Sequence, residues 1–105
     1  MTSSEDILLG LELLKQAADE MQKGNSQTAF EILNEVLSVC PIQWWHAYYA
    51  RGLIYAGWGN YQTAIEDFDR ASQILQDDFN NGDIDIDTFA NSLAEILFHK
   101  GVAER

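Results

Sequence analysis

The stretch GNSQTAFE at Gly24–Glu31 returns 35 residues later as GNYQTAIE at Gly59–Glu66, with six of the eight letters unchanged. A repeat with a period of this size is typical of stacked supersecondary units, each too small to bury its own apolar face. Each unit then depends on its neighbours to complete its core. We therefore expect a repeat array that presents a binding surface, because such arrays seldom house a reaction.

The composition is that of one folded domain with a strong negative charge. The chain has 105 residues, 47% of them hydrophobic, so a single modest core can form. Six Lys and Arg against 17 Asp and Glu give a net charge of -11. This charge repels phosphate backbones and anionic lipid headgroups, which argues against binding to nucleic acid or to a membrane surface. The acidic residues are dispersed, so most are expected on solvated helix faces.

The amino-terminal sequence predicts a cytoplasmic protein. Met1–Asp6 lacks the basic start of a secretion signal. The apolar run Ile7–Leu14 is too short to span a bilayer and is interrupted by Gly10 and Glu12. We therefore expect the chain to be soluble.

Apolar residues recur at helical spacing along the chain, and no segment reads convincingly as a strand. We therefore expect an all-α fold of about five helices. Gly24 and Gly101 are expected to end the first and fifth helices, and Asp87 or Thr88 to begin the fifth. The expected helices cover about residues 4–23, 26–39, 43–56, 61–76 and 86–101.

The second copy of the repeat carries a longer pattern: Tyr48-x-x-Arg51-Gly52-x-x-Tyr55, then Gly59-x-Tyr61-x-x-Ala64-x-x-x-Phe68-x-x-Ala71. This pattern resembles the tetratricopeptide repeat, which reads W-x2-L-G-x2-Y, then A-x3-F, then P. The letters have steric reasons, because Gly52 and Ala64 are small where two antiparallel helices would approach closely. The resemblance implies a single domain of two repeats, 4–41 and 42–78, with a capping helix at 86–101.

The first unit fits the family pattern more loosely. Ala17 takes the place of Gly52, and Pro41 closes the unit as the family proline does. Glu20 stands where the family has tyrosine, and the second unit has Gln76 in place of the closing proline. We expect these departures to affect boundaries more than the fold.

The resemblance also implies where a partner would bind, because this family usually holds its partners in a concave groove lined by the first helix of each repeat. The positions carried over occur at spacings of three, four and three residues, so each set lies along one helical face. An apolar stripe of this kind is as readily explained by core packing. The nominated residues are Leu11, Leu14, Ala18 and Met21; His46, Tyr49, Leu53 and Ala56; and Thr88, Asn91, Glu95 and Phe98.

A surplus of aromatic residues favours a binding surface. The segment from Trp44 to Tyr61 holds more aromatics than the repeat pattern requires, and Trp44, Tyr49 and Trp58 have no place in that pattern. Aromatic residues that the packing pattern does not require, and that reach a surface, are common anchors of protein interfaces. We expect at least one of these three side chains to be exposed.

The expected partner is another protein that offers an apolar or basic peptide segment. Some members of the family clamp acidic tails with Lys, Arg and Asn, but here the equivalent positions are Leu14, Ala18, Tyr49 and Leu53. An apolar, aromatic or basic segment suits an apolar groove with acidic outer faces better than an acidic peptide does.

The run Ile7–Leu14 is apolar nearly all round, which is unusual for an end helix of an array. One explanation is that a second copy of the chain covers it, which would give a homodimer through helix one. The other is that the fifth helix folds back over it.

Catalysis, metal binding and cofactors are not expected. Cys40 and His46 could act as nucleophile and base by residue type, but no third residue is placed to orient them. The acidic run Asp83–Asp87 lacks the glycine and glutamate of a calcium loop, with Thr88 and Ala94 at those positions. Helix capping by Asp85 or Asp87 is the simpler explanation.

The sequence therefore predicts a non-catalytic protein-interaction module, such as an adaptor, an assembly factor or a chaperone-like subunit. The alternative is a structural homo-oligomeric subunit with helix one buried between copies. An acidic mimic of nucleic acid would need carboxylates at phosphate-like spacing along one face, and the sequence does not display that pattern. The predicted partner-binding residues are Leu11, Leu14, Met21, Trp44, His46, Tyr49, Leu53 and Trp58.

Overall fold

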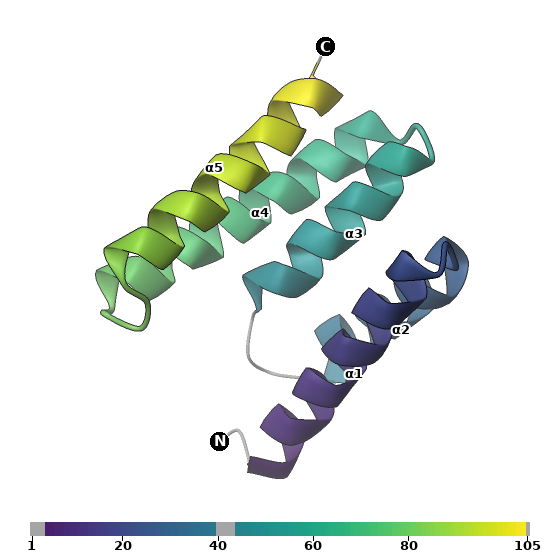
Figure 1. Cartoon of the computed structure of the whole chain (residues 1–105), viewed down its shortest axis with the longest axis horizontal. Helices are drawn as coiled ribbons and strands as arrows, with labels where there is room; N and C mark the ends of the chain where they lie inside the picture. The colour runs from purple at the N-terminus through teal and green to yellow at the C-terminus, as the bar shows by residue number, and fades with distance from the viewer. Residues whose placement is uncertain (1–3, 40–43, 105) are drawn as a thin grey trace.

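The computed structural model describes residues 4–39 and 44–104. These residues form five helices and no strand, which confirms the predicted all-α fold (Figure 1). The helices are α1 (Ser4–Gln22), α2 (Ser26–Val39), α3 (Trp45–Gly57), α4 (Tyr61–Asn80) and α5 (Ile86–Ala103).

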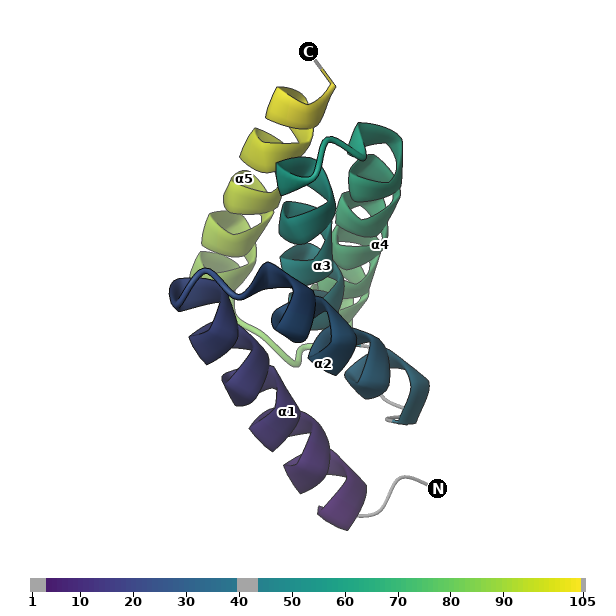
Figure 2. The same ribbon diagram turned by 90° about the vertical axis from the view of Figure 1, so that its right-hand side faces the viewer.

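Each helix packs against the next one along the chain. The helices α1 and α2 form one antiparallel hairpin, α3 and α4 form a second, and α2 joins the two by packing on α3. The last helix, α5, lies along α4 (Figures 1 and 2). The first helices of the two hairpins, α1 and α3, also touch, as do α3 and α5. This is the nearest-neighbour packing of a helical-repeat array.

The duplicated sequence produces a duplicated turn. Gly24 and Gly59 have φ values of +85° and +83°, a conformation that glycine adopts without steric strain. The next N–H in each turn donates to a carbonyl five residues back, from Asn25 to Glu20 at 2.8 Å and from Asn60 to Tyr55 at 2.9 Å. Both turns are therefore the same Schellman-type helix end, which reverses the chain between antiparallel helices.

The core consists of two apolar clusters on opposite sides of α3. The first cluster lies within the α1–α2 hairpin and includes Ala47 and Ile54 from α3. The second fills the space between α4 and its neighbours, with Phe68 and Leu75 from α4 and Ile96 from α5 fully buried. Because α3 is buried on two faces, it holds the array together: the α1–α2 hairpin buries apolar surface against one face, and α4 and α5 bury apolar surface against the other.

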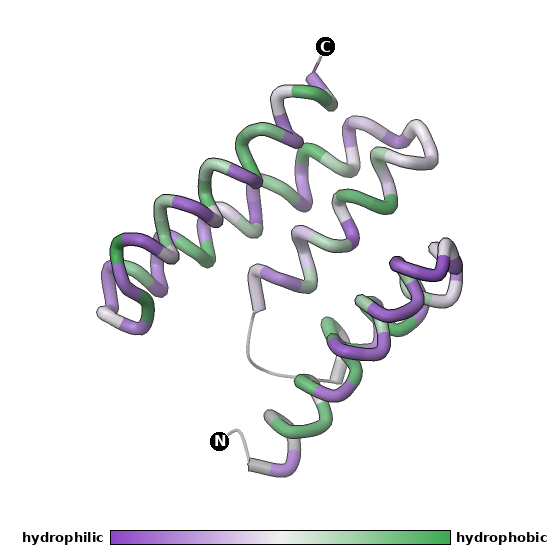
Figure 3. Tube along the Cα trace, in the orientation of Figure 1, coloured by the Kyte–Doolittle hydropathy of each residue, from purple (hydrophilic) through white to green (hydrophobic). Residues whose placement is uncertain are grey.

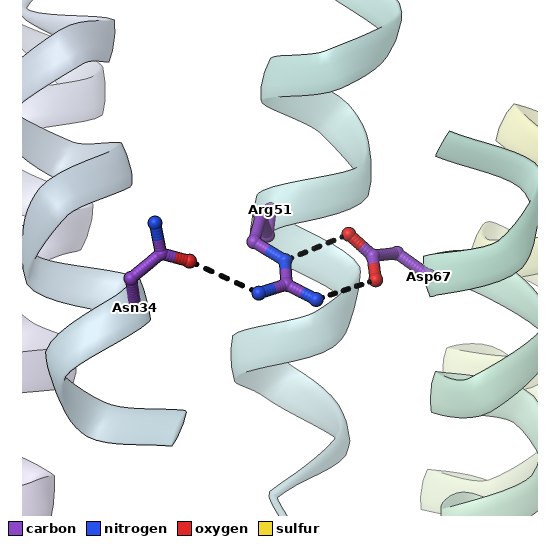
Figure 4. Close-up of polar contacts among 3 residues, drawn as sticks. All are labelled: Asn34, Arg51 and Asp67. Atoms are coloured by element: carbon purple, nitrogen blue, oxygen red, sulfur yellow. Dashed lines mark hydrogen bonds and ion pairs between the residues drawn. The ribbon is translucent and has the colours of Figure 1, made fainter. Parts of the chain in front are cut away.

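A polar network crosses the array at the level of α3 (Figure 4). The guanidinium of Arg51 donates from Nε and Nη2 to the two carboxylate oxygens of Asp67, both at 2.9 Å, and from Nη1 to Oδ1 of Asn34 at 3.0 Å. Asp67 is only 5% exposed, so its charge needs this partner. The hydrogen bond to Asp67 also raises the pKa of Arg51. One arginine thus connects α2, α3 and α4.

Two helix ends differ from prediction, and the cap of α5 is one of the alternatives considered. The helix α4 continues one turn beyond Gln76 to Asn80, because no proline blocks it there. The helix α5 begins at Ile86, as in the expected range 86–101. The cap expected at Asp87 or Thr88 was wrong, and the alternative Asp85 is the cap, since its side chain accepts from the Thr88 N–H at 2.8 Å. The predicted stop at Gly101 was also wrong.

The last turn of α5 continues through Gly101 because Ala103 is buried against the second cluster. Packing therefore overrides the local preference of glycine for a helix end. Pro41 and Gln43, expected at the junction between the two units, lie outside the described residues.

Candidate functional site

The first pocket lies between α1 and α3 and is almost wholly apolar. It has a volume of about 360 Å³. Helix α1 contributes side chains from one face, at the helical spacing expected from the sequence. The residues lining the pocket are Leu11, Leu14, Lys15, Ala17, Ala18, Met21, Leu33, His46 and Ala50. Five of the twelve nominated groove positions therefore surround one cavity.

A second pocket of about 390 Å³ continues the first, because the two share Leu11, Leu14 and His46. Its far side consists of residues from the start of α3 and from the end of α4 and the connection to α5. These residues are Trp44, Trp45, Asp78, Asp83 and Ile84. We call the two pockets together the α1 groove.

The amino-terminal half of α1 adds Leu11 to the groove and carries further leucines that are exposed. Figure 2 shows this half extending beyond the other helices, and Figure 3 shows it as a hydrophobic segment. The side chain of Leu8 is 64% exposed and that of Leu11 is 50% exposed. The helix α5 does not contact α1 in the described part of the chain. The alternative in which the fifth helix folds back over the first is therefore wrong.

The imidazole of His46 stands at the junction of the two pockets. Its ring stacks on Trp45, with centroids 3.8 Å apart and planes inclined by 27°. The residue as a whole is exposed, yet desolvation of the imidazole by burial lowers the pKa of His46 below its ordinary value of 6.5. At pH 7 the ring is therefore neutral, which suits an apolar surface.

Tyr49 and Leu53, also nominated for the groove, lie outside these pockets. Both are half-buried and pack against the second core cluster, between α3 and α5. The Tyr49 ring is 6.0 Å from that of Phe68, and burial together with a hydrogen bond to the Glu95 carboxylate raises the pKa of Tyr49. Their role as partner-binding residues stays a prediction.

The surplus tryptophans fall in two different places. Trp44 packs against the first core cluster and lines the second pocket. Trp58 lies just beyond α3, where its ring contacts those of Phe30 and Tyr55 with centroid separations of 5.1 and 6.3 Å. Trp58 is 42% exposed, which confirms that at least one of the surplus aromatics reaches the surface.

The acidic side of the groove was not predicted. Asp78, Asp83 and Ile84 come from a part of the chain outside the repeat pattern, so the pattern could not place them opposite α1. The buried Asp67 was missed too, although a carboxylate on the apolar stripe of α4 was a usable signal that a cation must meet it.

Other kinds of site find no support in the described ranges. No group of three or more His, Cys, Asp or Glu side chains is placed there to hold a metal ion. No helix among the described residues has the length and apolar character needed to cross a membrane. Cys40 lies outside those residues, so the pair it was considered to form with His46 is not described.

Residues 46–76 match the family model of the tetratricopeptide repeat. The chain contains a tetratricopeptide repeat. The matched segment covers nearly all of α3 and most of α4, and with the turn geometry it defines a tetratricopeptide-type helical repeat. No curated protein and no solved structure matches the chain. Tetratricopeptide repeats are generally protein-binding modules without catalytic activity.

Glu20, which stands where the pattern has tyrosine, makes different contacts from the tyrosine of the matched repeat. In the matched repeat this tyrosine is Tyr55, whose ring packs edge-on against Phe30 of the preceding α2 at 5.3 Å. Glu20 instead accepts a hydrogen bond from Nδ2 of Asn25 at 2.8 Å and pairs with Lys23.

Proposed function

We propose that the chain is a non-catalytic protein-interaction module that binds a segment of a partner protein in the α1 groove. The observation that carries this proposal is the apolar lining that α1 and α3 share around a cavity of about 360 Å³. Apolar concavities with a few polar groups are the usual binding sites of proteins. An adaptor or assembly factor would use the groove in this way.

Binding through the groove is tested with a variant that alters it without unfolding the chain. Leu11 and Ala18 are both exposed, so Leu11→Ser with Ala18→Gln makes the groove polar and narrower while leaving the core intact. The matched control is Leu97→Ser with Ala90→Gln, at exposed positions of α5 outside the described pockets. Both variants should keep the wild-type melting temperature.

Each immobilised variant is then used to recover proteins from the native cell extract, and the recovered proteins are quantified by mass spectrometry. The proposal expects at least one protein that the wild type and the control retain and the groove variant loses, with affinity weakened by about 2 kcal/mol or more. Equal recovery by all three proteins would show that binding occurs elsewhere, and the exposed Trp58 would become the next surface to change.

The exposed leucines of α1 favour a second candidate, a structural subunit whose first helix is buried between copies of the chain. Leu8, Leu9 and Leu11 are all between 49% and 64% exposed. Light scattering during gel filtration distinguishes the two candidates, because an obligate assembly stays large on dilution. Under this alternative, Leu8→Glu should give a smaller species, since a carboxylate buried without a partner is costly at an interface. The cytoplasmic location stays a prediction.

A further inference from the structure

The α1 groove has two chemically different sides. One side is the apolar face of α1, with Leu11 and Leu14. The other includes the carboxylates of Asp78 and Asp83, which flank the carboxyl-terminal end of α4. A ligand that fills the second pocket therefore meets leucine side chains on one side and negative charge on the other.

Three features make the acidic side strongly negative. The carboxyl end of a helix carries a partial negative charge, and α4 has no basic residue in its last turn to offset it. Asp77 lies next to Asp78 in the same turn. Neither Asp78 nor Asp83 forms an ion pair with another described residue. Their charges are therefore available to a partner.

Burial and the neighbouring carboxylates both act on Asp78. Burial, followed by the charges of Asp83 and Asp77, raises the pKa of Asp78. A cation placed between Asp78 and Asp83 would relieve this repulsion, whereas an anion would increase it. The chain as a whole carries a charge of -11, so its long-range field also attracts a basic segment and repels an acidic one.

We propose that the partner segment combines apolar side chains with an adjacent Lys or Arg, the apolar ones seated on Leu11 and Leu14 and the cation between Asp78 and Asp83. This inference rests on the proposed function, since it specifies the ligand of the same groove. It follows from charge complementarity: the apolar side supplies affinity, and the acidic side selects the sign of the ligand's charge.

The experiment begins with a library of random peptides displayed on phage and selected against the full-length chain. Peptides that bind the wild type and the α5 control, but not the Leu11→Ser, Ala18→Gln variant, are the groove-dependent set. The strongest of them is synthesised with a fluorescent label, both as selected and with every Lys and Arg replaced by Gln. Fluorescence anisotropy then gives the affinity of each peptide at low and at high salt.

The critical variant is Asp78→Asn with Asp83→Asn, and its control is Glu31→Gln with Glu35→Gln. The control removes the same charge from exposed positions of α2 that line neither pocket. We expect the selected peptides to be enriched in Lys or Arg next to apolar residues. The Asp78, Asp83 variant should bind the basic peptide roughly tenfold more weakly and lose most of the salt dependence, while the control changes binding little.

The possible failures are distinguishable. Groove-dependent peptides without enrichment of Lys or Arg would overturn this inference and leave the proposed function standing. Equal affinity of the basic peptide for the wild type and for the Asp78→Asn, Asp83→Asn variant would do the same. A preference for acidic peptides would overturn it as well. The absence of any groove-dependent peptide would contradict the proposed function and this inference with it.

Discussion

Gly52 lies so close to the ring of Phe68 that a Cβ at position 52 would come within 2.7 Å of Cε1 and 2.8 Å of Cδ1. Phe68 is fully buried in the second core cluster, so its ring has little room to move away. The family pattern requires a small residue at this position, and the structure gives the reason. The two helices of the matched repeat meet with the glycine of one against the aromatic ring of the other.

Gly52→Ala should therefore destabilise the chain, although alanine is the better helix former. Overpacking against Phe68 is expected to cost about 1 to 3 kcal/mol, which exceeds the gain of about 1 kcal/mol in helix propensity. Gly101→Ala is the matched control, because Gly101 is also helical and nothing lies within 4 Å of its would-be Cβ. The control should be neutral or slightly stabilising in urea unfolding. A stabilised Gly52→Ala variant would show that the crossing is looser than described.

The Arg51 network should be essential for the stacking of the two hairpins. Removing its buried partner by Asp67→Ala leaves the arginine charge uncompensated, and we expect a loss of about 2 to 3 kcal/mol in unfolding free energy. Arg51→Lys should be nearly as harmful, because an ammonium cannot donate two parallel hydrogen bonds to one carboxylate. Asn34→Ala should cost less, about 1 kcal/mol, since Asp67 keeps its partner. A double-mutant cycle between positions 51 and 67 measures the coupling, and a coupling near zero would contradict this account.

Tyr49 should contribute to stability through its ring more than through its hydroxyl. Its ring packs against the second core cluster, so Tyr49→Ala is expected to cost about 2 kcal/mol or more. Tyr49→Phe keeps the packing and loses the hydrogen bond to Glu95, with an expected cost of about 1 kcal/mol or less. Thermal unfolding of both variants checks the order. Equal losses would assign the main role to the hydroxyl.

Asp78 should lower stability at neutral pH. A carboxyl group with a raised pKa in the folded chain binds its proton more tightly there, so protonation favours folding and this benefit is lost as the pH rises through the folded-state pKa. Asp78→Asn should therefore raise the melting temperature at pH 7 and leave it unchanged at about pH 3, where the carboxyl is protonated in both states. Circular dichroism at the two pH values measures the difference.

Two further variants check the cause of this effect. Asp83→Asn should lower the pKa of Asp78 in an NMR titration, because the negative charge of Asp83 helps to raise it. Asp87→Asn removes a carboxylate from the first turn of α5, where a negative charge is favourable. It should lower the melting temperature at pH 7. If Asp87→Asn raised stability as Asp78→Asn does, the effect would come from net charge and not from the place of each carboxylate.

The sequence alone was enough to predict the helices, the glycine turns and the antiparallel pairing within each unit. These features depend on contacts between residues a few positions apart, such as the hydrogen bond from Asn60 to Tyr55 and the positive φ of Gly59. Their sterics are the same wherever the segment occurs. The same locality explains why Leu11, Leu14, Ala18 and Met21 could be assigned to one face of a helix before any tertiary contact was known.

Only the tertiary structure decided which residues from distant parts of the chain meet. Arg51 joins Asn34 and Asp67, and Asp78 and Asp83 face α1, because the two hairpins stack at one angle set by the shape of their apolar surfaces. The same packing carries α5 past Gly101 and places Tyr49 against the second core cluster. Local preferences are worth about 1 kcal/mol per residue, so burial of whole apolar side chains overrides them where the two conflict.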